Sequence, residues 1–90
     1  MILIDPPNAA GHGRLWSHLV SDVSFAELHA FARAVDLPER AFDRDHYDVP
    51  AAWYDAMLAA GATPVSSREI VARLRAAGLR RPRPARPARG

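Results

Sequence analysis

The stretch "RLWSHLVSDVSFAELHAFARAV", residues 14–35, decides the fold, because a strand pattern passes directly into a capped helix. Residues 14–20 alternate, which predicts a strand with one set of side chains on each face. Ser24 and Glu27 then form a capping-box pattern, in which each side chain can satisfy a backbone N–H group at a helix start. Apolar residues recur at helical spacing over 28–35, so a helix follows the strand.

The rest of the chain continues this alternation of strand and helix. The predicted elements are a strand over 1–5 that is buried on both faces, a loop over 6–13, a strand over 14–20, a helix over 24–37, a short strand over 40–42, a helix over 50–61, a short strand over 62–66 and a second capped helix over 66–77. The expected order is therefore β-β-α-(β)-α-β-α. It predicts an α/β fold, a small layered domain with a sheet of three or four strands and three helices.

Charge divides the chain into two parts. All 12 cationic residues are arginines, and five of them lie in residues 80–90 among three prolines. This composition predicts a disordered tail that could contact nucleic acid or an acidic partner. Residues 1–79 are predicted to form one domain, in which seven arginines against ten acidic residues give a net charge of −3.

Composition also excludes several classes of protein. There is no cysteine, so disulfides, zinc ribbons and thiol catalysis are excluded. No apolar run reaches the roughly 18 residues that a membrane span needs. The N-terminal segment lacks the length and the basic leader of a signal peptide. We therefore expect a cytoplasmic protein that does not associate with a membrane.

The first candidate site lies where the first strand meets its loop. Asp5 ends the apolar run, at a position where ligands collect in α/β folds. The following loop carries His12, Gly13 and Arg14; glycine permits close approach of the backbone, and a guanidinium group offers a planar fork for a phosphate. The alternative is that Asp5 caps a turn and Arg14 is a surface residue.

The second candidate is "DRDHYDVP", residues 43–50, where His46 and Asp48 are suitable ligands for a divalent metal of intermediate hardness. We expect these two side chains to point to opposite sides of an extended loop, so that both reach one ion only if the loop bends. The alternative is that Asp48 helps to cap the helix predicted at Pro50 and that Asp43, Arg44 and Asp45 are solvated. His18, in the middle of a strand, is either a further ligand or a packed, hydrogen-bonded residue.

Topology decides whether these groups meet. A right-handed crossover through the helix over 24–37 makes the strand over 40–42 parallel to the strand over 14–20. If the first two strands form an antiparallel hairpin, we expect Asp5 and His46 on opposite edges of the sheet. If the connection crosses over, Asp5, His46 and Ser66 share one edge. A connection of this length fits either arrangement.

Seven short pieces occur in one order over residues 2–72: "LID" (3–5), "GR" (13–14), "SHLVSD" (17–22), "ELHAFA" (27–32), "HYD" (46–48), "GA" (61–62) and "RE" (68–69). This series resembles the DUF4031 family, a group of short bacterial and phage proteins. The resemblance implies a small α/β domain and no assigned activity. "ERAFD" (39–43) and "AAWYDAM" (51–57) depart from the family pattern, which is richer in aromatic residues at the first and in basic residues at the second.

The candidate residues fall within this pattern, so the resemblance favours one convergent polar site. The catalytic candidates are Asp5, His18, His46 and Asp48; the candidate ligands of a divalent metal are Asp5, His46 and Asp48; the candidates for binding a phosphate-containing ligand are His12 and Arg14. The function predicted for such a site is metal-dependent hydrolysis of a nucleotide or nucleic-acid phosphoester. The alternative is a non-enzymatic accessory module whose basic tail, residues 80–90, contacts nucleic acid or an acidic partner.

Overall fold

The computed structural model describes residues 1–80 and confirms the predicted α/β class with three helices. The elements are β1 (Ile2–Ile4), β2 (Ala9–Gly11), β3 (Arg14–Ser21), α1 (Phe25–Ala34), the 3-10 turn η1 (Glu39–Ala41), β4 (Phe42–Asp43), β5 (His46–Pro50), the 3-10 turn η2 (Ala51–Trp53), α2 (Tyr54–Ala59), β6 (Thr63–Pro64) and α3 (Ser67–Ala76). The sheet has six strands, more than the three or four expected, because β2 and β5 form in segments that were predicted as loops.

The long strand β3 organises the sheet, whose order is β4-β5-β3-β1-β6. β1 runs antiparallel to β3, with Ile4 opposite Leu19, and β2 pairs with the other end of β3 on the same side. β5 pairs antiparallel with the opposite side of β3. The first strands are therefore connected as an antiparallel hairpin, and the crossover alternative does not occur.

The loop between β2 and β3 is a two-residue turn formed by His12 and Gly13. Gly11 pairs with Arg14, and the two central residues have φ angles of +49° and +73°. Positive φ at both central residues is typical of a type I′ turn, whose twist matches that of the flanking strands. Gly13 is thus required by the turn, whereas the sequence had suggested a glycine that admits a ligand.

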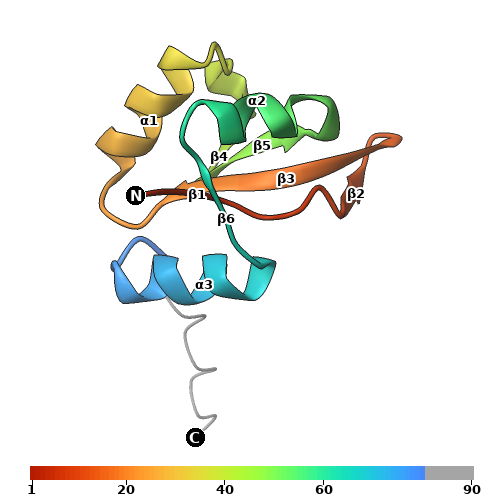
Figure 1. The fold of residues 1–90 in the computed structure, drawn as a ribbon. Coiled ribbons are helices and arrows are strands. Elements are labelled where there is room, and N and C mark those ends of the chain that lie inside the picture. The colour runs from red at the N-terminus through yellow and green to blue at the C-terminus, as the bar shows by residue number, and fades with distance from the viewer. Residues whose placement is uncertain (81–90) are drawn as a thin grey trace, which may run out of the picture.

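Helices cover both faces of the sheet: α1 and α2 lie on one face and α3 on the other (Figure 1). The larger core, under α1 and α2, contains Ile2, Ile4, Leu19, Leu28, Ala32, Leu37, Tyr47, Val49, Met57 and Ala62. The smaller core, under α3, contains Leu3, Val20, Ile70 and Leu74. β1 therefore contributes to both cores, as its continuous apolar run predicted.

Both predicted helix caps form, but only the serine hydrogen bond of each capping box is present. Ser24 Oγ accepts the Glu27 N–H at 3.1 Å, and Ser66 Oγ accepts the Glu69 N–H at 3.0 Å. The two glutamates do not reach back to the cap residues. The Glu27 carboxylate accepts a hydrogen bond from Ser21 Oγ, whereas the Glu69 carboxylate accepts one from an arginine one turn later.

The region before α2 differs from the prediction. Residues 40–42 were expected to be a strand, but they lie mostly in η1, and β4 begins only at Phe42. The helix expected over 50–61 begins at Tyr54, because Pro50 keeps an extended backbone (ψ 147°) as the last residue of β5. Gly61 follows the helix with a φ of +110°, the conformation that favours glycine after a C-terminus.

The predicted tail falls almost wholly outside the described residues. Residues 81–90, with any contact they make to nucleic acid, lie beyond residue 80, so that expectation stays a prediction. Arg80 is described, and its guanidinium forms an ion pair with Asp45 at 2.7 Å. Within residues 1–80, no helix is both long and apolar enough to span a bilayer.

The small core under α3 provides a first test, because Leu74 is fully buried there. We expect Leu74→Ala to lower the free energy of unfolding by about 2–5 kcal/mol, the usual cost of the lost contacts and the cavity. Arg75→Ala, at the exposed neighbouring position, should change it by less than about 0.5 kcal/mol. Urea unfolding followed by circular dichroism measures both. Equal stabilities for the two variants would contradict this account of how α3 is held.

Candidate metal site

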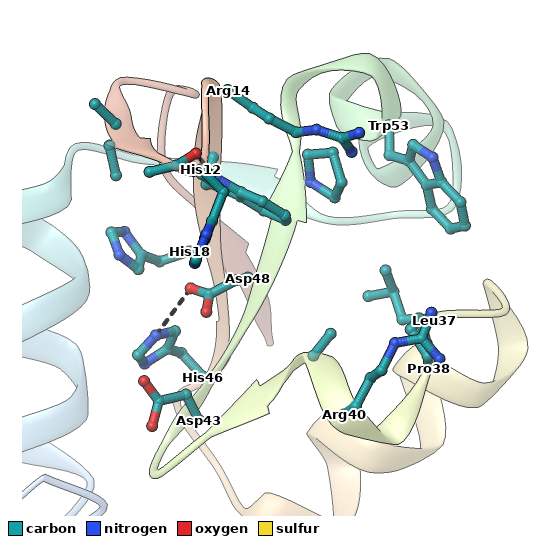
Figure 2. A pocket seen from close by; sticks show the side chains of 16 residues that line it. His12, Arg14, His18, Leu37, Pro38, Arg40, Asp43, His46, Asp48 and Trp53 are labelled. Carbon is teal, nitrogen blue, oxygen red and sulfur yellow. Dashed lines mark hydrogen bonds and ion pairs between the residues drawn. The ribbon is translucent and has the colours of Figure 1, made fainter.

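His18, His46 and Asp48 converge on the α3 face of the sheet, from the neighbouring strands β3 and β5. His18 lies directly opposite Asp48 in the register, so the two side chains share a face. One nitrogen of each histidine and one oxygen of Asp48 all lie within 4.8 Å of one another. In Figure 2 the three side chains lie beside one another, and the dashed line joins His46 to Asp48, where Nε2 is 3.1 Å from Oδ1.

The expectation that His46 and Asp48 point to opposite sides was wrong. Both belong to β5, and residues two apart on a strand project from the same face. No bend is needed to bring them together. Tyr47 and Val49, which alternate with these residues along β5, project from the opposite face into the larger core.

Asp5 lies directly beneath His18 and holds its ring. The Asp5 side chain is fully buried, and its Oδ2 lies 2.9 Å from His18 Nδ1. Its Oδ1 accepts the backbone N–H of His18 at 2.6 Å, and its Oδ2 also accepts the hydroxyl of Ser67 at 2.6 Å. The carboxylate therefore joins β1, β3 and the start of α3.

These contacts shift the pKa of both partners. Burial alone would raise the pKa of Asp5, but the hydrogen bonds from His18 and Ser67 outweigh it and hold the pKa below 3.8. The hydrogen bond to Asp5 in turn raises the pKa of His18 above 6.5, against the effect of burial. Because Asp5 is a carboxylate, Nδ1 of His18 carries the proton and donates it, which leaves Nε2 free when the ring is neutral.

His46 is held in the same way by a different carboxylate. Its Nδ1 lies 2.9 Å from Oδ1 of Asp45, a residue that is only 8% exposed. Arg80 donates to both oxygens of Asp45, from Nε at 2.7 Å and from Nη2 at 2.9 Å. Burial would raise the pKa of Asp45, but these partners lower it below 3.8. His46 therefore also directs Nε2 toward the centre of the group.

Two histidines whose Nδ1 atoms are held by buried carboxylates, and of which His46 also directs Nε2 to Asp48, have the usual surroundings of metal-bound histidine. Around an ion bound tetrahedrally at about 2.0–2.2 Å, ligand atoms lie roughly 3.3–3.6 Å apart. The contact between His46 and Asp48, at 3.1 Å, is close to this spacing. A modest movement of His18, whose ring centre lies 5.0 Å from that of His46, completes the set. The residues present therefore fit a divalent metal ion.

The expectation that a hairpin separates Asp5 from His46 was also wrong. It assumed that residues 40–42 run parallel to β3, so that the two residues end at opposite edges. In the structure the neighbour of β3 is β5, and it runs antiparallel. Asp5, His18 and Asp48 consequently form a row across three adjacent strands, with His46 beside it.

The remaining candidates lie in the cleft around this group. His12 and Arg14 line it from the hairpin between β2 and β3, whereas Asp5 is buried below it and is not among the three grouped ligands. The cleft has a volume of about 780 Å³, which is in the range of small-molecule sites. Within residues 1–80, β4 pairs only with the first two residues of β5, so residues 48–50 form an open edge at the cleft.

Three residues that support the site were not predicted: Asp45, Ser67 and Arg80. Asp45 was grouped with solvated acids, although its position next to His46 was a possible signal. Ser67 follows the cap residue Ser66, and no local pattern distinguishes it. Arg80 was assigned to the tail because of its composition, and only the tertiary structure shows that it returns to the sheet.

The pairing of Asp5 with His18 can be tested directly. We expect Asp5→Asn to lower the pKa of His18, because the amide keeps the shape of the carboxylate but removes the charge that stabilises the imidazolium. Titration of the imidazole resonances by NMR measures the change. Asp55→Asn, in the exposed first turn of α2, is the matched control and should leave the pKa of His18 unchanged. The same pKa in both variants would remove Asp5 as its cause.

Comparison with known proteins agrees with the resemblance seen in the sequence. The model of the family described as "Protein of unknown function (DUF4031)" matches residues 2–77 of the 90-residue chain. No curated protein and no solved structure matches the chain.

Proposed function

The chain belongs to the DUF4031 family, and we propose that this protein binds a divalent transition-metal ion through His18, His46 and Asp48 and hydrolyses a phosphate-containing ligand there. The observation that carries the proposal is the pair of carboxylate–histidine contacts, each at 2.9 Å, from two buried aspartates. A carboxylate bonded to Nδ1 is the usual way in which a metal-binding histidine is oriented, whereas a histidine that only packs needs no such partner.

The ligand set favours a metal of intermediate hardness. Two imidazoles and one carboxylate suit Zn²⁺, Mn²⁺ or Fe²⁺, whereas Ca²⁺ and Mg²⁺ prefer oxygen ligands. Structural zinc sites use four protein ligands, and sites with three leave a position for water or substrate. The three grouped ligands lie at the cleft and not in a core, which supports an exchangeable position open to a ligand.

The charges of the cleft favour an anionic ligand once the ion is bound. Its lining includes Arg14, Arg40, Asp43 and Asp48, whose formal charges cancel. A divalent ion would therefore leave the cleft positive. When bound, the ion would polarise a phosphate oxygen and so assist attack by water at phosphorus. The water oxygen forms the new bond to phosphorus, the ester P–O bond breaks, and the proton that the water loses goes to the leaving alkoxide.

Asp5 has a different role in this proposal from the one expected from sequence. Its two oxygens are occupied by His18 and Ser67, and its side chain is fully buried. It orients His18 and makes the ring a better electron donor, so it is a positioning residue. Asp45 has the equivalent role for His46. His12 and Arg14 remain the candidates for contacting the phosphate.

The direct test is metal binding by Asp48→Asn, since this side chain is 40% exposed and its loss should not disturb folding. We expect the wild-type chain to bind Mn²⁺ or Zn²⁺, with a rise in melting temperature. The variant should bind at least about 100-fold more weakly, because losing only a hydrogen-bond partner of a metal ligand already weakens binding by up to about 100-fold. Isothermal titration calorimetry measures the affinity. Asp55→Asn, which makes the same chemical change on α2, should bind like the wild type.

Hydrolysis is followed in the same proteins as Mn²⁺-dependent release of phosphate from a nucleotide, and it should disappear in Asp48→Asn. A wild-type chain that binds neither metal would overturn the whole proposal. Metal binding without phosphate release would retain the site but remove hydrolysis as its activity.

Metal affinity should also depend on pH. Protonated histidine cannot bind a metal, and Asp5 raises the pKa of His18 above 6.5. As the pH falls through this pKa, protons compete with the ion, so the affinity should fall by roughly tenfold per pH unit for one displaced proton. Competition with a chromogenic chelator between pH 8 and pH 6 measures this slope. An affinity that is constant over that range would exclude His18 as a ligand.

A further inference from the structure

Beside the candidate metal ligands, the cleft has a flat aromatic wall. Trp16 lies two residues before His18 on β3, so both side chains project from the same face. The two backbone positions are about 7 Å apart at the usual strand rise. This separation is comparable with that between the base and the phosphate of a nucleotide.

The ring of Trp16 is fixed in orientation. Its Nε1–H donates to the backbone carbonyl of Gly11 on the paired strand β2 at 2.9 Å. A Cβ atom at Gly11 would lie 3.6 Å from Trp16 Nε1, so the ring lies close against this strand. An indole that is held at one edge and lines a cleft is a preorganised surface for stacking.

Small side chains leave room beside this ring. β2 consists of Ala9, Ala10 and Gly11, and all three line the cleft together with Trp16. A second indole, Trp53, lines the cleft from η2 and is 39% exposed. In Figure 2 it lies on the side of the cleft away from His18. The cleft therefore offers apolar and aromatic area in addition to its polar group.

The cleft has two arginines in its lining, whereas the domain as a whole is acidic. Arg14 and Arg40 are exposed and line it from β3 and η1. Residues 1–79 carry a net charge of −3, which disfavours the broad electrostatic contact of a long nucleic acid. A small anion with a flat apolar part matches the cleft better than a polymer.

We propose that the ligand of the cleft is a mononucleotide, whose base stacks on Trp16 while its phosphate reaches the ion held by His18, His46 and Asp48. This inference rests on the proposed function and adds the substrate class to it. The base adds affinity through stacking on an aromatic face, and such stacking tolerates different bases. A phosphate ligand that lacks a base would contact only the metal and the arginines.

The experiment compares four probes on the full chain with Mn²⁺ present: AMP, ribose 5-phosphate, adenosine and inorganic phosphate, each titrated by calorimetry. We expect AMP to bind at least about tenfold more tightly than ribose 5-phosphate, since stacking of one base is worth roughly 5- to 150-fold. Trp16→Leu should reduce AMP binding to the level of ribose 5-phosphate and leave Mn²⁺ binding unchanged. Trp53→Leu should have a smaller effect.

Equal affinities for AMP and ribose 5-phosphate in the wild-type chain would overturn the inference, and this comparison needs no variant to fold. Loss of Mn²⁺ binding in the wild type would instead be a failure of the proposed function. A Trp16→Leu chain that is folded and still prefers AMP would exclude Trp16 as the stacking surface.

Discussion

The buried carboxylate of Asp5 is the interaction on which the rest of the structure depends. A carboxylate with no exposed surface is costly unless every part of it is hydrogen-bonded. Here the His18 ring and backbone and the Ser67 hydroxyl supply those bonds. They come from β3 and α3, so satisfying one charge fixes the position of three elements. Removing any partner would leave the charge buried and under-bonded, which makes this arrangement specific.

A single pair of this kind has a purely structural explanation, in which Asp5 and His18 only join the strands. The second pair argues against that reading, because Asp45 and His46 repeat it at the start of β5, and both histidines belong to the same group. A common ligand explains why two separate carboxylate–histidine pairs converge on one group. Asp48, half-buried in the same group, adds a carboxylate where a metal ion would need one.

Sequence alone predicted the elements whose signals are local. The caps at Ser24 and Ser66 and the double-sided burial of β1 follow from short patterns. β2 and β5 were missed because three to five residues beside turn-forming residues carry little periodicity. The histidines were identified by residue type, but their partners depend on strand register and on the path of the chain after α3. Register is a long-range property, so Arg80 could not be placed beside Asp45 from composition.

Helix α3 connects the stability of the fold to the geometry of the site. Just inside its N-terminus Ser67 donates to Asp5, and just beyond its C-terminus Arg80 binds Asp45, so the two ends of one helix hold the two carboxylates that orient the histidines. The path to Arg80 requires Gly78, whose φ of +74° lets the N–H of Leu79 bond back to the helix. The small core under α3 therefore does more than cover the sheet. It sets the distance between Ser67 and Arg80, and so between the supports of the two carboxylates that hold the histidines.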